Sequence, residues 1–312
     1  TIVLEEISQS QEVILSLNLL NEPGHQEGSI FTDTTFAAGG YHTCAILDDG
    51  SLNCWGFDAF GQLGDGGSNT DKNTPVSVSL GTGRTAVAVS AGGYHTCAIL
   101  DDGSLNCWGD DYYGQLGDGG TNTNKNTPVS VSLGTGRTAV AVSAGYAHTC
   151  AILDDGSLNC WGYDAYGQLG DGGSNTNKDT PVSVSLGTGR TAVAVSAGGY
   201  HTCAILDDGS LNCWGYDVFG QLGDGGSNTN KDTPVSVSLG TGRTAVAVSA
   251  GEYHTCAILD DGSLNCWGRD NYGQLGDGGT YTDKNTPVSV SLGTGRTAVA
   301  VSAGGYHTCA IL

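Results

Sequence analysis

Short runs of alternating apolar and polar residues, separated by turns rich in Gly, Asp and Asn, recur along almost the whole chain. In one stretch the runs are residues 85–90 (TAVAVS), 95–100 (HTCAIL), 104–108 (SLNCW) and 128–133 (PVSVSL). Alternation of this kind is typical of half-buried β-strands, and the turn residues indicate tight connections between them. The intervening segment 114–126 (GQLGDGGTNTNKN) is too polar and too rich in Gly and Asn for a strand, so we expect a loop there.

A period of 53 residues organises these runs into repeats. The segment YHTCAIL or a close variant recurs at this step and places its cysteine at Cys44, Cys97, Cys150, Cys203, Cys256 and Cys309. Five copies are complete and a sixth stops at Leu312. Four antiparallel strands per repeat, the first built of small residues, are typical of blades that crowd together at a common axis. We therefore predict an all-β propeller of four-stranded antiparallel blades, with six or seven blades if closed. The alternative is a β-solenoid, whose coils are usually shorter and lack a hairpin turn such as LDDGS in every unit.

The segments GGYHTCAILDDGSLNCWG and YGQLGDGG resemble the repeat of the regulator of chromosome condensation family, in its bacterial and extracellular form with paired cysteines. The resemblance covers residues 36–312. It implies a β-propeller, most often of seven blades, in which the His of each repeat is a packing and hydrogen-bonding residue.

Residues 1–35 fall outside the repeat and form a separate N-terminal segment with two predicted strands, at residues 2–4 and 12–20. These strands either join the half-blade 297–312 and close the ring, or pair with another module or a neighbouring subunit. The sixth copy stops where the other five proceed to DDGSLNC, which leaves Cys309 without the partner that its equivalents have. We therefore expect the chain to continue past Leu312.

The cysteine spacing predicts a disulfide across each hairpin. The turn from Leu47 to Ser51 reads as a type I turn followed by Gly50 in the left-handed region. Counting outward from this turn places Cys44 opposite Cys54 at a non-hydrogen-bonded site, where Cα atoms lie about 4.5 Å apart. That separation falls within the range of about 4.4 to 6.8 Å that a disulfide needs. The predicted bonds join Cys44 to Cys54, Cys97 to Cys107, Cys150 to Cys160, Cys203 to Cys213 and Cys256 to Cys266.

Five matched pairs indicate an oxidising compartment, so we expect a secreted or cell-surface protein. Zinc would need four ligands per site, and the hairpin spacing supplies two thiolates. Buried free thiols in a cytosolic protein are the other alternative. Each short loop closed by a disulfide is expected to contribute on the order of 2 to 3 kcal/mol to stability.

Charge disfavours two classes of partner. The formal net charge is −21, no Lys or Arg precedes Lys72, and the eleven basic residues are spread along the chain. Affinity for phosphate backbones comes mainly from clustered Lys and Arg, so we expect no nucleic-acid partner. No run of 18 apolar residues occurs, so we also expect no membrane insertion.

Two repeated features resemble catalytic or metal chemistry. Histidine recurs once per repeat, at His42, His95, His148, His201, His254 and His307. A ring of imidazoles can bind metal or transfer protons, but no second ligand type converges at coordination spacing, so we expect a packing role and no metal site. The pair Asp48 and Asp49, with its copies, reads as turn chemistry rather than paired catalytic carboxylates.

The loop from Asp65 to Asp71 (DGGSNTD) is rich in oxygen-bearing side chains, which makes Ca²⁺ a candidate ligand. It lacks the spaced acids and terminal Glu of a known calcium loop. No nucleophile-elbow, phosphate-loop or zinc-protease motif occurs in the sequence. We therefore expect no enzymatic activity and no cofactor.

The few positions at which the copies differ are the best candidates for partner binding. They are Phe57, Ala59, Asp110, Tyr112, Tyr146, Tyr163, Tyr216, Glu252, Arg269, Asn271 and Tyr281. Loops at blade rims are where propellers bind partners, and Tyr, Phe and Arg are common interface anchors. Neutral drift at exposed positions is the alternative. The repeated Trp and the aromatic-Gly-Gln-Leu-Gly segment after it can form a sugar-stacking array, although such a Trp more often fills space between blades.

Three functions fit these observations. The first is a non-enzymatic extracellular interaction or scaffold module, as a subunit of a cell-surface assembly or filament that binds a protein partner or itself. The second is a nucleotide-exchange regulator of a small GTPase, which the resemblance implies but the paired cysteines and the lack of a basic tail disfavour. The third is a secreted enzyme inhibitor. The first is our prediction.

The disulfide prediction can be tested directly. Peptide mapping without reduction, on protein from its native source, should recover the five linked pairs across the five hairpins. Free thiols at those ten positions would remove the argument for secretion.

Overall fold

The computed structural model describes residues 36–120 and 122–312, and every regular element in this part of the chain is a β-strand. The segment 1–35, with the strands predicted at 2–4 and 12–20 and their role in closing a ring, lies outside the described residues. No helix that could span a membrane occurs in the described part.

Within residues 36–120 and 122–312, five four-stranded antiparallel sheets and one two-stranded sheet follow one another, each with its strands in chain order. The first contains β1 (Phe36–Ala38), β2 (His42–Ile46), β3 (Leu52–Gly56) and β4 (Lys72–Ser77). The second contains β5 (Ala86–Ala91), β6 (His95–Leu100), β7 (Leu105–Gly109) and β8 (Lys125–Ser130). The third contains β9 (Ala139–Ala144), β10 (His148–Leu153), β11 (Leu158–Gly162) and β12 (Lys178–Ser183). The fourth contains β13 (Ala192–Ala197), β14 (His201–Leu206), β15 (Leu211–Gly215) and β16 (Lys231–Ser236). The fifth contains β17 (Ala245–Ala250), β18 (His254–Leu259), β19 (Leu264–Gly268) and β20 (Lys284–Ser289), and the last pairs β21 (Ala300–Ala303) with β22 (Thr308–Ile311).

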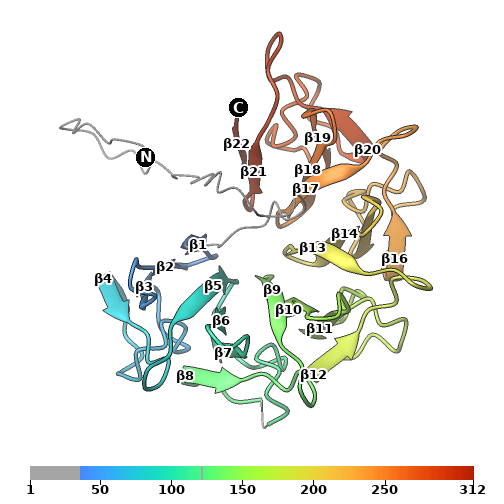
Figure 1. Cartoon of the computed structure of the whole chain (residues 1–312). Helices are drawn as coiled ribbons and strands as arrows, with labels where there is room; N and C mark the ends of the chain where they lie inside the picture. The colour runs from blue at the N-terminus through green and yellow to red at the C-terminus, as the bar shows by residue number, and fades with distance from the viewer. Residues whose placement is uncertain (1–35, 121) are drawn as a thin grey trace, which may run out of the picture. The chain divides into compact units, whose positions relative to one another are not determined.

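The sheets are the blades of a propeller. Figure 1 shows the Ala- and Val-rich first strands, such as β5 and β9, nearest the centre and the fourth strands, such as β8 and β12, at the periphery. Small residues suit the crowded inner position. Pro128 lies in β8, an edge strand, where a missing backbone N–H costs no ladder hydrogen bond. The predicted blade architecture is confirmed.

The fourth strand begins earlier than predicted. It spans Lys125–Ser130 rather than residues 128–133, so the preceding loop is shorter than 114–126. Lys125 pairs with Gly109, and a register shift between Cys107 and Gly109 lets the polar residues before the proline join the sheet. The predicted end was also wrong, because the chain turns directly after the strand, where the N–H of Leu133 donates to the carbonyl of Val131 at 3.0 Å.

Each hairpin has the predicted register. Cys44 lies opposite Cys54, and the Leu47 N–H donates to the Ser51 carbonyl at 2.8 Å. Gly50 has φ +78°, the left-handed conformation that the turn requires. The sulfur atoms of all five predicted pairs are bonded, with Cα atoms 4.0 to 4.1 Å apart. Cys309 is exposed and has no disulfide partner in the described residues.

The apolar core lies between the blades. Trp108 on β7 of the second blade packs with Leu52, Leu63 and Val78 of the first. The same arrangement recurs in each later pair of complete blades, and Trp108, Trp161, Trp214 and Trp267 are all fully buried. These tryptophans therefore fill space between blades, as one of the two alternatives for them predicted, and do not form a sugar-stacking array.

A glycine of the long loop makes room for each tryptophan. Gly117 has φ +67°, and a Cβ built on it would lie 2.5 Å from Nε1 of Trp161. Gly64 stands in the same relation to Trp108, at φ +68° and 2.5 Å. In the first four GQLG segments the second glycine is thus required both by its conformation and by the close approach of the next blade.

Gly117→Ala should therefore destabilise the protein more than Gly136→Ala. Both glycines have positive φ, but a Cβ at Gly136, where φ is +73°, meets nothing within 4 Å. Both variants carry the left-handed cost of about 1 to 2 kcal/mol, and crowding against Trp161 adds about 1 to 3 kcal/mol. Guanidinium unfolding of both variants measures the difference. Equal losses would mean that Trp161 does not pack against this glycine.

Candidate functional site

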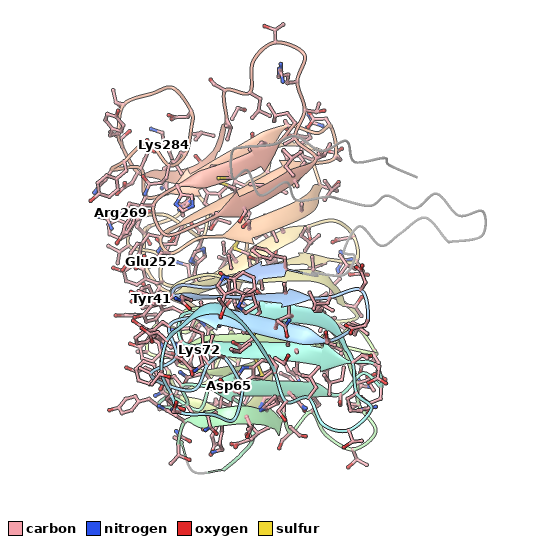
Figure 2. The ribbon with its side chains drawn as sticks, turned by 90° about the vertical axis from the view of Figure 1, so that its left-hand side faces the viewer. Tyr41, Asp65, Lys72, Glu252, Arg269 and Lys284 are labelled. Carbon is pink, nitrogen blue, oxygen red and sulfur yellow. A yellow bond between two sulfur atoms is a disulfide. The ribbon has the colours of Figure 1, made fainter. Side chains whose placement is uncertain are left out.

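The residue that precedes β2 and the residue that follows β3 lie at the same end of the blade. In the first blade, the hairpin of β2 and β3 ends with His42 opposite Gly56, so Tyr41 and Phe57 are neighbours. The Phe57 N–H donates to the Tyr41 carbonyl at 3.0 Å. The later blades repeat this arrangement. Figure 2 shows Tyr41, Glu252 and Arg269 along one side of the blades. Most positions at which the repeats differ therefore converge at one end of the sheets.

Aromatic side chains from successive blades meet at this end. Tyr41 stacks on Tyr94 with ring centroids 4.9 Å apart, and Tyr200 stacks on Tyr253 at 5.6 Å. Separations of about 4.5 to 7 Å are those at which aromatic rings attract one another. We call this surface the aromatic face. It consists of Tyr41, Phe57, Phe60, Tyr94, Tyr113, Tyr146, Tyr163, Tyr166, Tyr200, Tyr216, Phe219 and Tyr253.

A pocket of about 260 Å³ opens in the aromatic face at the third and fourth blades. Its lining consists of Tyr113, Tyr146, Ala147, Tyr163, Tyr166, Tyr200, Tyr216 and Tyr253. Burial raises the pKa of Tyr163 to about 12, so its hydroxyl is a neutral donor at physiological pH. The pocket therefore combines ring faces with phenolic hydroxyl groups.

Charged residues accompany the rings. The guanidinium carbon of Arg269 lies 5.0 Å from the ring centre of Phe219 and 5.4 Å from that of Tyr253, within the range of a cation–π interaction. Glu252 precedes Tyr253. The pKa of the Tyr253 hydroxyl is raised mainly by burial, next by the charge of Tyr200, and then by the negative charge of Glu252. Asp110 holds in the second blade the position of Arg269 in the fifth, and its N–H donates to the Tyr94 carbonyl at 2.9 Å, so the face carries one cation and the carboxyl groups of Glu252 and Asp110 among neutral rings.

The remaining variable positions lie outside the pocket. Asp110 accepts a hydrogen bond from the side-chain amide of Gln115 at 2.8 Å, and burial raises the pKa of its carboxyl group. Tyr112 and Tyr281 are 72% and 71% exposed. Ala59 and Asn271 are exposed as well. Of the predicted residues, the structure brings Tyr146, Tyr163 and Tyr216 together in the pocket, with Phe57, Glu252 and Arg269 elsewhere on the same face.

The repeated histidines join neighbouring blades rather than line a site. His42 Nε2 lies 2.7 Å from the hydroxyl of Thr96, and that hydroxyl donates to the backbone carbonyl of Gln62 at 2.8 Å. The indole N–H of Trp108 donates to the same carbonyl at 2.9 Å. Because the threonine gives its only proton to the carbonyl, it accepts from the imidazole, which is therefore protonated at Nε2.

Burial sets the charge of these imidazoles. It lowers the pKa of His148 to about 4 and that of His201 to about 3. In the described residues no three His, Cys, Asp or Glu side chains lie close enough together to hold a metal ion. The histidines are structural groups of the contact between blades, as the resemblance implied.

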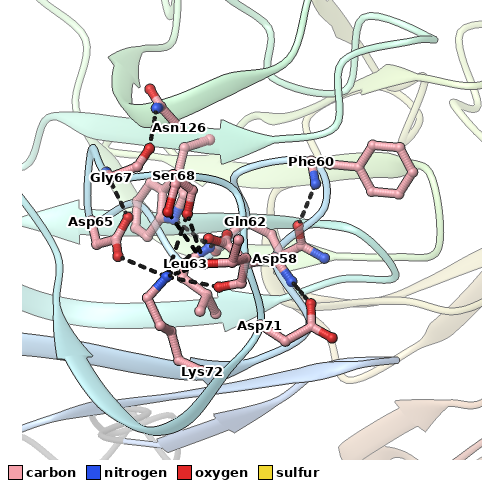
Figure 3. A network of polar contacts seen from close by, with 12 residues as sticks. Asp58, Phe60, Gln62, Leu63, Asp65, Gly67, Ser68, Asp71, Lys72 and Asn126 are labelled. Carbon is pink, nitrogen blue, oxygen red and sulfur yellow. Dashed lines mark hydrogen bonds and ion pairs between the residues drawn. The ribbon is translucent and has the colours of Figure 1, made fainter.

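A lysine occupies the oxygen-rich loop that begins at Asp65. The ammonium group of Lys72 lies 2.7 Å from the Thr70 carbonyl, 3.4 Å from the Ser68 carbonyl and 3.4 Å from the Asp65 carboxylate (Figure 3). It also lies 3.9 Å from the buried Asp58 carboxylate. The loop therefore supplies its own cation where Ca²⁺ would bind, and its geometry gives no support to the calcium candidate.

The paired acids of the hairpin turns lie at the opposite end of the blades. Arg84 contacts both Asp101 and Asp102, and the Ser104 N–H donates to Asp102 at 3.0 Å. Arg137, Arg190 and Arg243 repeat the contact. The four pairs that begin at Asp101, Asp154, Asp207 and Asp260 thus each share an arginine at an exposed turn, where such ion pairs contribute little stability.

Comparison with known proteins agrees with this geometry. The sequence profile of the RCC1-like domain matches residues 12–312. The chain belongs to the RCC1-like domain family. The resemblance found in the repeat motifs is confirmed, and the blades described above are RCC1-like blades.

Several curated proteins contain similar RCC1-like sequences. The ultraviolet-B receptor UVR8 of Arabidopsis thaliana is 34% identical over 251 residues, which cover 80% of this chain and 56% of the receptor. The RCC1 domain-containing protein RUG3, mitochondrial, of the same plant is 31% identical, over 82% of this chain and 58% of its own length. The E3 ubiquitin-protein ligase HERC2 of Homo sapiens is 31% identical over 88% of this chain but only 6% of the ligase. The chain thus spans just over half of the two plant proteins and a small part of the human ligase.

Solved structures show the same fold. Yeast RCC1 (Prp20), solved bound to Kap60, has a TM-score of 0.76 at 24% identity, over 88% of this chain and 67% of Prp20. Human WBSCR16 has a TM-score of 0.77 at 22% identity, over 88% of this chain and 70% of its own. A further Prp20p structure is described with binding properties to Gsp1p and histones.

Sequence reasoning missed much of the aromatic face because it looked for differences between the repeats. Tyr94, Tyr200 and Tyr253 occupy one repeat position, and Tyr113 and Tyr166 another. Repetition alone would suggest a role in packing. A signal was available in the sequence. The cysteine register pairs the second and third strands of each repeat, and both aromatic positions flank the ends of these strands, so they lie at the same end of every blade.

The buried histidines predict an acid-sensitive fold. The folded-state pKa of His148 lies below the ordinary value of 6.5, so the unfolded chain binds the proton more readily, and stability falls as pH drops from about 6.5 towards 4. The slope for one such histidine approaches about 1.4 kcal/mol per pH unit. His148→Gln should remove this contribution, so its stability relative to the parent should rise as pH falls, measured by urea unfolding between pH 7 and 4.5.

Burial raises the pKa of Asp164 to about 6, so carboxyl groups of this kind make stability rise as pH falls. Both proteins contain these groups, so their contribution cancels when the variant is compared with the parent. His307→Gln is the matched control, because His307 occupies the same repeat position but is exposed. A stability difference for His148→Gln that stays constant with pH would show that this histidine is not buried in its neutral form.

Proposed function

We propose that this RCC1-like chain is a non-enzymatic protein-interaction module of the extracellular space, which binds its partner through the aromatic face. The observation that carries the proposal is the meeting of aromatic side chains from all five complete blades at one end of the sheets, around a tyrosine-lined pocket. Tyr and Arg in clustered positions contribute most of the binding energy in many protein interfaces.

The extracellular setting rests on the cysteines. Five hairpins each contain a bonded cysteine pair, and such bonds persist in oxidising compartments. The names of the relatives do not specify one compartment, since RUG3 is described as mitochondrial. The assignment to the cell exterior is therefore our inference from the chemistry of this chain.

Nucleotide exchange on a small GTPase is the runner-up among the functions considered. The likeness to Prp20 is at 24% identity and concerns the fold alone, so no activity is carried over from it. A nucleotide-release assay with a purified small GTPase tests the alternative, and stimulation by the full chain would overturn our proposal.

Electron microscopy of native material tests the scaffold form, because ordered polymers would assign the protein to a filament.

Affinity capture with matched variants tests the binding face. Tyr163→Ala with Tyr216→Ala alters the aromatic face, and Asp154→Asn with Asp155→Asn alters exposed turns at the opposite end. The parent and the turn variant should capture the same extracellular protein, identified by mass spectrometry and re-tested in purified form. The aromatic variant should bind it at least about tenfold more weakly, as expected for anchor residues.

Disulfide mapping and near-ultraviolet circular dichroism of both variants serve as folding controls. Equal capture by the two variants, or loss in the turn variant alone, would contradict the proposed face.

A further inference from the structure

The pocket exists because one repeat departs from the others at two adjacent positions. Where the other copies have Tyr before the repeated His, as at Tyr94 and Tyr200, the third blade has Ala147. Where most copies have Gly just before that Tyr, it has Tyr146. Ala147 is buried and forms part of the pocket lining, while the ring of Tyr146 lies 5.6 Å from that of Tyr94 and 5.9 Å from that of Tyr200. The exchange of a large side chain for a methyl group thus leaves a space walled by tyrosines.

The size of the pocket limits its occupant. Its volume of about 260 Å³ is below the range of about 300 to 1,000 Å³ that is typical of sites for drug-sized ligands. One side chain projecting from a partner fits this scale better than a free ligand does. Most of the lining is tyrosine, which offers ring faces and hydroxyl groups but no charge of its own.

Electrostatics favour a cation in this space. The faces of aromatic rings carry partial negative charge, which attracts ammonium and guanidinium groups. The formal net charge of the chain is −21. Glu252 adds a carboxylate next to the pocket: it precedes Tyr253, and a Cβ built on Gly199, the residue before Tyr200, would lie 2.9 Å from the Cα atom of Glu252. Both of these tyrosines line the pocket.

The protein already contains one example of the contact. Arg269 lies over the rings of Phe219 and Tyr253, and Tyr253 also lines the pocket. The residues that occupy the position of Arg269 in the third and fourth blades are Tyr163 and Tyr216. There the walls are aromatic and the chain supplies no arginine. A guanidinium from outside would complete the contact that the fifth blade makes internally.

We propose that the pocket at Ala147 binds an arginine side chain of the partner protein. The planar guanidinium stacks on ring faces and donates hydrogen bonds to phenolic oxygens and carboxylates. The inference rests on the proposed function, whose partner it describes more closely: a protein that presents an exposed arginine to an acidic, tyrosine-rich surface. The positive charge of Arg269 repels a second cation nearby, and the negative charge of Glu252 offsets that repulsion.

Nuclear magnetic resonance titration of the full chain tests the proposal. The probes are N-acetyl-arginine amide, the neutral isostere N-acetyl-citrulline amide, and methyl glucoside as a sugar. We expect the arginine probe to bind more tightly than the citrulline probe by a factor of roughly 2 to 30, the range of a cation–π contribution. Chemical shifts of the tyrosine rings report the site.

Three variants locate the binding. Tyr146→Gly with Ala147→Tyr gives the third blade the Gly-Tyr pair that most other copies have, so it should fold and abolish binding of the arginine probe. Glu252→Gln should reduce the preference for arginine over citrulline. Asp154→Asn is the control, because it removes one carboxylate as Glu252→Gln does, but in an exposed turn at the opposite end of the blades; it should leave binding unchanged.

The proposal would be overturned if the arginine probe did not bind, if it bound no more tightly than the citrulline probe, or if the sugar bound more tightly. Unchanged binding in the Tyr146→Gly, Ala147→Tyr variant would overturn it as well. The proposed function fails separately. If partner capture depends on Tyr163 and Tyr216 while the arginine probe does not bind, only the inference about arginine falls. If the probe binds but capture does not depend on those tyrosines, the proposed function falls.

Discussion

One backbone carbonyl in each long loop holds a blade to the next. The oxygen of Gln115 accepts hydrogen bonds from the hydroxyl of Thr149 and from the indole of Trp161, both at 2.9 Å and both on the following blade. The hydroxyl of Thr149 in turn accepts from His95, at 2.8 Å. Three donors thus meet in a place closed to water, where an unpaired polar group would cost about 1 to 3 kcal/mol. Burial at this contact keeps His95 neutral, and the close approach of the Trp161 indole requires a glycine at Gly117.

The contact between blades explains why so little varies in most of the repeat. Each blade must fit the one before it and the one after it, so a change on one contact has to suit both sides. The disulfide acts within a blade and joins its two middle strands, independently of the neighbours. At the aromatic end neighbouring blades are joined by a backbone hydrogen bond, as from the Tyr146 N–H to the Gly198 carbonyl at 3.2 Å, which leaves side chains free to vary except where a ring stacks on its neighbour. The exchange at Tyr146 and Ala147 can therefore open a pocket while the hydrogen bonds to Gln115 stay in place.

Much of the fold could be predicted because its determinants are local and repeated. The turn at Gly50 fixes the register of its hairpin, and the register fixes the cysteine pairing. The start of the fourth strand could not be predicted in this way, since it depends on a register shift, with extra residues between Lys125 and Val129 opposite β7, and not on alternation along its own residues. The oxygen-rich loop was misleading for a similar reason: Lys72 follows it in sequence but folds back over it, which spacing alone does not reveal. Of the candidate site, the variable residues were predicted, while the repeated tyrosines that complete the pocket became apparent only from the way in which blades meet.

Amide hydrogen exchange of a Trp161→Phe variant tests most directly whether these contacts hold the blades together. The change removes the indole, one of the two donors to the Gln115 carbonyl, and leaves the disulfide between Cys150 and Cys160 in place. We predict a loss of protection along both sides of the contact between the second and third blades, with the amides of the hairpin formed by β10 and β11 still protected. Loss confined to the third blade, or spread evenly over all blades, would contradict the account.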